Sequence, residues 1–167
     1  MQLAYRATHD GLTGLPNRSH AEARVSQALL SDATPALAAV LFIDLDNMKV
    51  VNDELGHQAG DTMLKVAAAR LRAGLRSEDF VARLGGDEFV ALLFGSTGRP
   101  VLEQLSARLH EALGAPFEVM GTHRAMTASI GVTEVRPDDH RDAANILRDA
   151  DLAMYRAKAT RGGTCYA

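Results

Sequence analysis

Paired glycines between two strand-like runs are the feature that most constrains the fold of this chain. Residues 83–89 read Arg-Leu-Gly-Gly-Asp-Glu-Phe, with apolar residues before them at 80–81 and after them at 90–94. Such a pattern predicts a β-hairpin, because glycines adopt positive φ without Cβ strain. We expect the turn to deliver Asp87 and Glu88 to the first residues of the returning strand, where successive side chains point to opposite faces.

A nearly continuous apolar run over 36–45 predicts a central strand that is buried on both faces. Asp44 and Asp46 lie at its carboxyl end. Taken alone, these two acids fit a role in ending the strand. If the strand neighbours the hairpin, however, their carboxylates converge with those of Asp87 and Glu88.

Apolar residues at spacings of three and four predict helices elsewhere in the chain. We expect the end of a helix over 1–9, a helix capped by Asn17 that breaks at 31–35, and a short helix or turn over 49–56. Longer helices are expected from Gly60, over 102–113 and over 143–157, with a loop at 95–100 and strands at 117–120, 124–135 and 164–166. These elements predict a single α+β domain over 1–167, with a central, mostly antiparallel or mixed sheet flanked by helices.

Composition excludes several classes of protein. A chain of 167 residues is long enough to bury a real core, and its net charge of −3 offers no basic surface for nucleic acid or for anionic membranes. The single cysteine, Cys165, excludes a disulfide framework within the chain and fits a reducing compartment. No apolar run reaches membrane-spanning length, and the first residues given lack the basic-then-apolar pattern of a secretion signal. We therefore expect a cytoplasmic segment without direct membrane contact; a membrane anchor elsewhere in the full-length protein stays open.

Converging carboxylates need a cation, because close negative charges otherwise force protonation. Mg²⁺ accepts one or two protein carboxylates and takes its other ligands from water and phosphate oxygens. The chain has no cysteine or histidine cluster of the kind that binds zinc. Asp44 and Asp46, taken together with Asp87 and Glu88, therefore favour a Mg²⁺ (or Mn²⁺) site.

Two further polar residues, Asn52 and Asp61, fit more than one role. An amide together with a carboxylate matches the edge of guanine, whose N1–H and amino group are donors. From spacing alone, Asp61 between Gly60 and Thr62 fits a helix cap instead. Lys49 and Lys158 fit either phosphate contacts or solvent exposure.

Seven ordered motifs together resemble the GGDEF domain family of diguanylate cyclases. They are DGLTGLPNR at 10–18, FIDLD at 42–46, KVVND at 49–53, GHQAGD at 56–61, RLGGDEF at 83–89, SIG at 129–131 and ADLAMYRAK at 150–158. The resemblance implies a palm-like fold similar to that of nucleotidyl cyclases. It also implies condensation of two GTP molecules into cyclic di-GMP, with release of pyrophosphate. Each protomer of an antiparallel homodimer would hold one GTP.

The resemblance also implies roles for individual residues. Asp44 and Asp87 would bind Mg²⁺ with the Leu45 carbonyl, and Glu88 would assist at a second metal or activate the 3′-hydroxyl. The substrate-binding residues would be Asn52 and Asp61 on guanine, Leu64 in the base pocket, Lys49 and Lys158 on phosphates, and Gly85 and Gly86 where the hairpin lies against the nucleotide.

The resemblance also implies a product-inhibition site at the Arg-x-x-Asp sequence over 76–79, which five residues separate from Gly85. Arg76 supplies a planar fork for guanine or phosphate, and Asp79 accepts from a guanine edge. Arg108 on the following helix would contribute from the second protomer.

Two departures from the family pattern stand out. Met48 replaces the usual phenylalanine before Lys49, a soft substitution that should preserve packing. After Lys158 the chain has Arg161 and Gly162 in exchanged order, which leaves the role of Arg161 open. Two other functions stay open: a silent GTP-binding regulatory module that precedes a phosphodiesterase (EAL) domain, or a cyclic di-GMP receptor. In each case we expect the segment to belong to a longer signalling protein with sensory or EAL domains.

Overall fold

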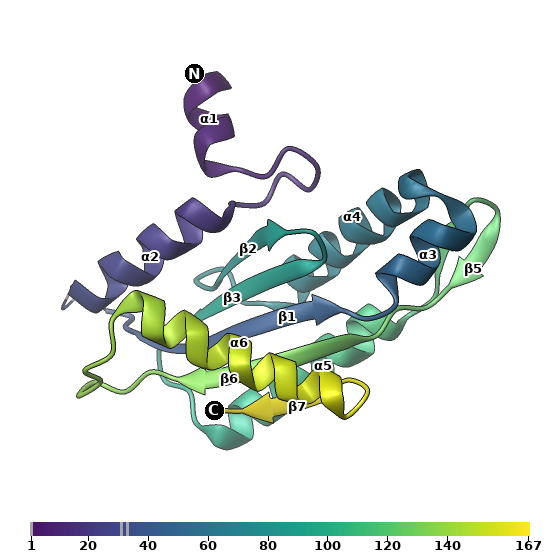
Figure 1. The fold of residues 1–167 in the computed structure, drawn as a ribbon. Coiled ribbons are helices and arrows are strands. Elements are labelled where there is room, and N and C mark those ends of the chain that lie inside the picture. Colours follow the sequence, from purple (N-terminus) through teal and green to yellow (C-terminus); the bar gives the residue numbers. More distant parts are fainter. Residues whose placement is uncertain (1, 31, 33) are drawn as a thin grey trace.

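A five-stranded mixed sheet forms the centre of the computed structural model, which describes residues 2–30, 32 and 34–167 (Figure 1). The central strand β1 (Leu37–Leu45) runs antiparallel to both β3 (Glu88–Phe94) and β6 (Ala128–Glu134). Strand β2 (Phe80–Gly85) pairs antiparallel with β3, and β7 (Gly163–Tyr166) pairs parallel with β6. The sheet order β2-β3-β1-β6-β7 confirms the predicted mixed, mostly antiparallel sheet.

Helices cover both faces of this sheet, which confirms the α+β class (Figure 1). Helices α2 (Arg18–Leu30) and α6 (Ala143–Ala159) lie on one face. On the other face lie α3 (Met48–Leu55), α4 (His57–Gly74) and α5 (Arg99–Gly114). The short helix α1 (Gln2–Thr8) buries none of its residues and stands apart from the sheet, and β4 (Phe117–Val119) and β5 (Thr122–Arg124) form a separate hairpin.

Strand β1 contributes to the hydrophobic core on each face, as its apolar sequence predicted. Val40 and Phe42 pack in the core under α2 and α6, whereas Leu41 and Ile43 pack in the core under α3, α4 and α5. This alternation follows from the two-residue period of a strand. It places Asp44, the next even-numbered residue, on the face that α2 and α6 cover.

The predicted helix positions are right, but three boundaries are wrong. Helix α4 begins at His57 rather than Gly60, because the chain re-enters a helix directly after Gly56, whose φ is 89°. Helix α5 begins at Arg99, inside the predicted loop, since Pro100 is tolerated in a first turn where its missing N–H has no partner. The predicted strand over 124–135 is two strands, β5 and β6.

The structure also bears on the predicted helix cap at Asn17, the packing of Met48 and the predicted absence of a membrane-spanning segment. The side chain of Asn17 accepts a hydrogen bond from the His20 N–H at 3.1 Å, as expected of a helix cap. Met48 packs against the core under α3, α4 and α5. Residues 1, 31 and 33, within the predicted first helix and the predicted break, lie outside the described residues. None of the helices in the described part of the chain has the length and apolarity needed to span a bilayer.

Candidate functional site

The predicted hairpin joins β2 to β3 through a two-residue turn, Gly86 and Asp87, which we call the hairpin turn. Gly85 pairs with Glu88 across the ladder, and the φ angles of Gly85 and Gly86 are 131° and 51°. An L side chain is strained at such angles, so the backbone requires glycine both at the end of β2 and at the first position of the hairpin turn. Asp87 therefore lies in the turn itself, not on the returning strand as predicted, and β3 begins at Glu88.

Asp44 and Glu88 are directly opposite one another on β1 and β3. Both lie on the face covered by α2 and α6, because they continue the series of residues that pack in that core. The Leu45 N–H donates to the Asp87 carbonyl at 3.0 Å, which ties the hairpin turn to the end of β1. The structure thus brings together Asp44, Asp87 and Glu88, the acidic cluster, as the neighbouring-strand prediction required.

The acidic cluster carries more negative charge than its surroundings neutralise. Burial raises the pKa of Asp44 to about 6; the Lys158 ammonium, 2.9 Å from Asp44 Oδ1, opposes this rise, and the charges of Asp87 and Glu88 add to it. Burial and the charge of Asp151 raise the pKa of Glu88, while Arg18, 3.8 Å away, opposes the rise. A carboxyl group with a raised pKa among other carboxylates is a favourable position for a cation.

The residues present fit a hard cation that completes its coordination with non-protein oxygens. Within residues 2–30, 32 and 34–167, no group of three or more His, Cys, Asp or Glu side chains has a geometry that could hold a metal by itself. Mg²⁺ does not need such a cage, since it is usually held by one or two carboxylates together with water and phosphate oxygens. The nearly buried Asp44 beside Glu88 offers such a partial ligand set.

Asp46 is held differently from the acidic cluster. Its two carboxylate oxygens accept hydrogen bonds from the hydroxyls of Thr127 and Ser129, each at 2.9 Å. Its N–H also donates to the Thr127 carbonyl at 2.8 Å. These bonds join the end of β1 to β6, which is the strand-ending role that we considered for the aspartates at this position.

Lys158 and Arg161 line one hollow of about 370 Å³, together with Asp46, Asn47 and Thr127. Arg161 adopts a left-handed φ of 61° and is followed by Gly162 and Gly163, also with positive φ. The exchanged order of arginine and glycine therefore leaves the Arg161 side chain on the same hollow as Lys158. Lys49, by comparison, is exposed in the first turn of α3.

The predicted guanine-binding residues come from α3 and α4. Asn52 lies on α3, and Asp61 and Leu64 lie on α4, where Asp61 is exposed and Leu64 is buried. Asp61 is the fifth residue of α4, so its alternative role as a helix cap is wrong. Asn52 Oδ1 is buried and has no hydrogen-bond partner among the described residues.

The predicted inhibitory residues are only partly arranged for ligand binding. Arg76 and Arg108 line one hollow of about 410 Å³ between α4 and α5. The Asp79 side chain is only 1% exposed, and it accepts from the Phe94 N–H at 3.1 Å and pairs with Arg76 Nε at 3.3 Å. Arg76 also donates to the Phe94 carbonyl at 2.8 Å. The arginines thus share one surface, whereas the aspartate is turned inward.

One connection to the hairpin turn was not predicted. Arg83 donates to Asp10 and to the Gly86 carbonyl, so it joins the first motif of the chain to the hairpin turn. The sequence gives no signal for this contact, because 73 positions separate the two charged residues. Only an expectation that these motifs meet in space would have suggested it.

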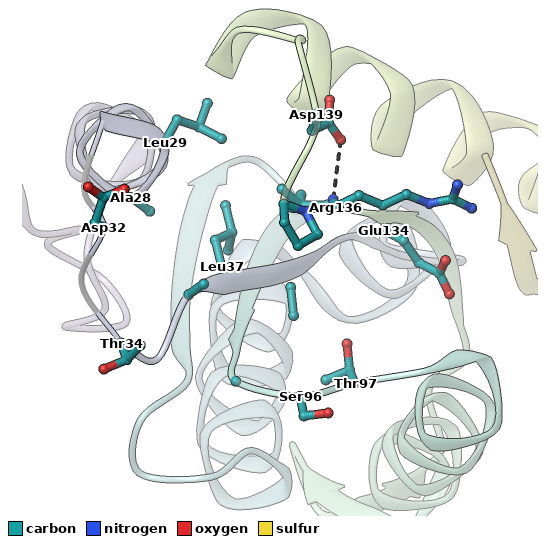
Figure 2. A pocket seen from close by; sticks show the side chains of 15 residues that line it. Ala28, Leu29, Asp32, Thr34, Leu37, Ser96, Thr97, Glu134, Arg136 and Asp139 are labelled. Carbon is teal, nitrogen blue, oxygen red and sulfur yellow. Dashed lines mark hydrogen bonds between the residues drawn. The ribbon is translucent and has the colours of Figure 1, made fainter.

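A separate hollow of about 580 Å³ lies at the opposite end of the sheet (Figure 2). It is bordered by the start of β1 at Leu37, by Ser96 and Thr97 after β3, and by Arg136 and Asp139 after β6. None of the predicted site residues lines it. This hollow is therefore separate from the candidate site.

Comparisons with known proteins find relatives over nearly the whole of this chain. A family model described as "Diguanylate cyclase, GGDEF domain" matches residues 7–164. The chain is 42% identical to an uncharacterized signaling protein of Caulobacter vibrioides and 42% identical to the diguanylate cyclase TpbB of Pseudomonas aeruginosa UCBPP-PA14. Each match covers 97% of this chain, but only 20% and 38%, respectively, of the relative's length.

Solved structures show the same fold. The GGDEF domain of TpbB from Pseudomonas aeruginosa superposes with a TM-score of 0.87 at 41% identity, covering 95% of this chain and 94% of that one. The coiled coil and GGDEF domain of DgcB from Caulobacter crescentus, in complex with c-di-GMP, gives a TM-score of 0.87 at 25% identity, covering 99% and 88%.

Proposed function

Because the chain belongs to the GGDEF domain family, we propose that it is a diguanylate cyclase domain, which condenses two GTP molecules into cyclic di-GMP and pyrophosphate. The observation that carries this proposal is the pairing of Asp44 with Glu88 across β1 and β3, beside the glycine-containing hairpin turn. The naming of TpbB as a diguanylate cyclase supports it. The chain spans only a fifth to two fifths of the first relatives, so the proposal concerns this domain.

In this proposal Asp44 and Asp87, with the Leu45 carbonyl, hold Mg²⁺ or Mn²⁺, which neutralises the phosphates of GTP when bound. Glu88 either assists at a second cation or accepts the proton of the attacking 3′-hydroxyl. Burial raises the pKa of Glu88, which makes its carboxylate a stronger proton acceptor for the second role. Positioning and charge neutralisation supply most of the catalysis in such phosphoryl transfers.

The remaining residues bind the substrate. Asp61 accepts from N1–H and the amino group of guanine, Asn52 contacts the same base, and Leu64 lines the pocket. Lys49 contacts phosphate from α3. Lys158, which pairs with Asp44, would contact a phosphate oxygen in the presence of a cation that neutralises Asp44, and Gly85 and Gly86 would allow the backbone to approach the nucleotide.

We further propose that two protomers, each holding one GTP, form an antiparallel homodimer for catalysis. Product binding at Arg76, Asp79 and Arg108 inhibits the enzyme, and the arginines that share one hollow support this assignment. We also propose that the domain lies in the cytoplasm, because its proposed substrate, GTP, is found there. Further sensory or EAL domains accompany it, in keeping with the greater length of the relatives.

The test is product formation from GTP and Mg²⁺ over a range of protein concentrations. A reaction between two loaded protomers gives a specific activity that rises with protein concentration, and Glu88→Gln abolishes it. Glu103→Gln, an exposed change on α5, serves as the matched control and leaves the activity unchanged. Absence of product even from an enforced dimer would contradict the proposal.

A silent GTP-binding module is the second candidate. The 39% identity, over 99% of this chain, to MucR of Pseudomonas aeruginosa, named a bifunctional diguanylate cyclase and cyclic di-GMP phosphodiesterase, supports a phosphodiesterase domain beside this one but not the loss of cyclase activity. GTP binding without turnover in the full-length protein would identify this function. Cyclic di-GMP binding without any cyclase activity would identify a receptor instead.

A further inference from the structure

Helix α4 contains a glycine where its backbone does not require one. Gly60 is the fourth residue of α4, is buried, and unlike Gly56 does not have a positive φ. Glycine destabilises a helix interior relative to alanine, because its backbone loses more conformational freedom on folding. Backbone conformation therefore gives no reason for glycine at this position.

The reason lies in the neighbouring helix. A Cβ atom added to Gly60 would lie 1.9 Å from Asn52 Oδ1, 2.9 Å from Asn52 Cγ and 3.3 Å from Asn52 Nδ2. The whole amide of Asn52 thus lies over the Cα of Gly60, in space that any side chain at residue 60 would occupy. No other glycine among the described residues places a side-chain amide in this way.

The orientation of the Asn52 amide also lowers the stability of the folded protein. Asn52 Oδ1 is buried and finds no hydrogen-bond partner among the described residues. An unpaired buried acceptor is unfavourable, and water would satisfy it if the side chain turned outward. Two unfavourable features, a helical glycine and an unpaired amide oxygen, therefore meet at one contact.

We propose that Gly60 is a positioning residue for guanine recognition: it leaves the space that holds the Asn52 amide against α4 in one orientation. The inference rests on the proposed function, in which Asn52 and Asp61 contact the base. A hydrogen bond tolerates only a few tenths of an ångström in length. A methyl group at residue 60 displaces the amide by more than that and removes its contact with guanine.

The experiment measures the binding of two ligands, by titration calorimetry in Mg²⁺, to four proteins: wild type, Gly60→Ala, Asn52→Ala and the double variant. The first ligand is α,β-methylene-GTP, which cannot release pyrophosphate. The second is inorganic tripolyphosphate, which lacks the base. We expect each single change to weaken binding of the GTP analogue about tenfold or more. The double variant binds it within twofold of Asn52→Ala, and all four proteins bind tripolyphosphate within twofold of one another.

Gly114→Ala is the matched control. It adds the same methyl group at the end of α5, where the nearest atom, the Met126 carbonyl oxygen, is 3.9 Å away. Binding of both ligands stays within twofold of wild type. Thermal unfolding supplies a second readout: Gly60→Ala raises the melting temperature of Asn52→Ala, in which the methyl group meets no amide, by more than it changes that of the wild type, in which the amide must move.

Three outcomes overturn the inference. Unchanged analogue binding by Gly60→Ala, while Asn52→Ala weakens it, overturns the role of Gly60 and leaves the proposed function intact. If Gly60→Ala weakens binding of the GTP analogue equally in the wild type and in Asn52→Ala, residue 60 acts through general packing and not through the Asn52 amide. Unchanged binding by Asn52→Ala overturns the guanine pocket of the proposed function together with this inference. If Gly60→Ala does not fold, the inference is tested by comparing the double variant with Asn52→Ala. The inference requires the double variant to fold and to have the higher melting temperature.

Discussion

Arg83 connects Asp10 to the hairpin turn through three hydrogen bonds. Its Nη1 lies 2.9 Å from Asp10 Oδ1, and its Nε and Nη2 lie 3.1 Å and 2.8 Å from the Gly86 carbonyl oxygen. The other carboxylate oxygen of Asp10 accepts from the N–H and hydroxyl of Thr13 at 2.8 Å and 2.7 Å. One guanidinium therefore holds the turn before α2 and the turn of the candidate site together.

Replacing Arg83 by alanine should lower the free energy of unfolding by about 2 kcal/mol, because it leaves the Asp10 carboxylate without its charged partner. The side chains of Arg83 and Asp10 are only 13% and 18% exposed, so water replaces the lost bonds poorly. Urea unfolding measures the change. Glu103→Gln, which breaks an exposed ion pair with Arg99, is the control and should stay within about 0.5 kcal/mol. Equal effects of the two changes would contradict the prediction.

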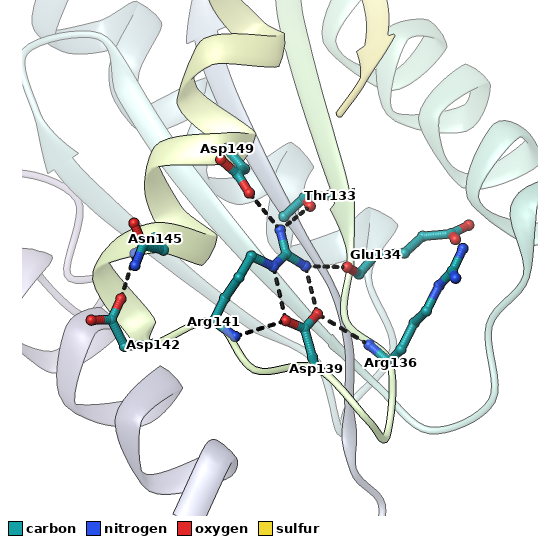
Figure 3. Close-up of polar contacts among 8 residues, drawn as sticks. All are labelled: Thr133, Glu134, Arg136, Asp139, Arg141, Asp142, Asn145 and Asp149. Atoms are coloured by element: carbon teal, nitrogen blue, oxygen red, sulfur yellow. Dashed lines mark hydrogen bonds and ion pairs between the residues drawn. The ribbon is translucent and has the colours of Figure 1, made fainter.

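A second prediction concerns the loop between β6 and α6, where Arg141 binds Asp139, Asp149, the Thr133 hydroxyl and the Glu134 carbonyl (Figure 3). Hydrogen bonds from Arg141 lower the pKa of Asp139 to about 2. A carboxyl group with a lowered pKa stabilises the fold above its ordinary pKa, and the effect is lost as the pH falls from about 4 towards 2. Asp139→Asn should therefore cost about 2 kcal/mol at pH 7 and almost nothing near pH 2.

Urea unfolding of wild type and Asp139→Asn from pH 7 down to pH 3 tests this, and the gap between the two proteins should narrow steadily. The neighbouring exposed residue supplies the control, since Asp138→Asn should change little at any pH. A gap that keeps its size down to pH 3 would refute the assignment.

A third prediction follows from the acidic cluster. Because burial raises the pKa of Asp44 to about 6, the folded state binds a proton there more tightly than the unfolded chain does. Stability from this group therefore falls as the pH rises from about 4 to 6. In the presence of a chelator, Asp44→Asn should raise the unfolding free energy by about 2 kcal/mol at pH 7 and hardly at all at pH 4.

Added Mg²⁺ should reverse this order, by stabilising the wild type through binding to the folded state alone and leaving Asp44→Asn unaffected. Melting temperatures measured against Mg²⁺ concentration give the result. Asp53→Asn, an exposed change on α3, should respond to Mg²⁺ like the wild type. Equal stabilisation of wild type and Asp44→Asn would place the cation elsewhere.

A fourth prediction separates two residues of the inhibitory site. Asp79→Ala should lower the unfolding free energy by about 2 kcal/mol, since it removes the acceptor of the Phe94 N–H and the partner of Arg76. Arg108→Ala loses only an exposed bond to the Gly74 carbonyl and should cost less than about 1 kcal/mol. Both should weaken inhibition by cyclic di-GMP, measured as residual activity, but only Asp79→Ala should show a lowered urea midpoint. Equal midpoints would contradict the buried role of Asp79.

Local patterns predicted much of the fold correctly, because the hydrophobic periods of this chain are clear. The strand ending at Asp44 and the hairpin through Gly85 and Gly86 both follow from side-chain patterns within a few residues. Their pairing required only that two apolar strands be neighbours. The misplaced start of α4 has a local cause: His57 and Gln58 carry no apolar signal, yet their backbone is already helical.

Contacts between distant polar residues could not be predicted in this way. The inward turn of Asp79 depends on the Phe94 backbone, and the contact between Arg83 and Asp10 depends on the packing of two separate turns. Asp61 illustrates the same limit, since its neighbours in sequence fit a cap and only the helix start at His57 rules that out. The family resemblance, not spacing, assigned that residue to the base.

Strand β1 gives the two halves of the candidate site a common register. Its even-numbered residues lead to Asp44 on one face, and its odd-numbered residues pack against the helices that carry Asn52 and Asp61 on the other. A slip of β1 by a single residue would exchange the two sets of side chains between the faces. Such a slip would misplace the acidic cluster and disrupt the packing behind the base pocket at once. Selection on either half of the site therefore also preserves the pairing of β1 with β3 and β6.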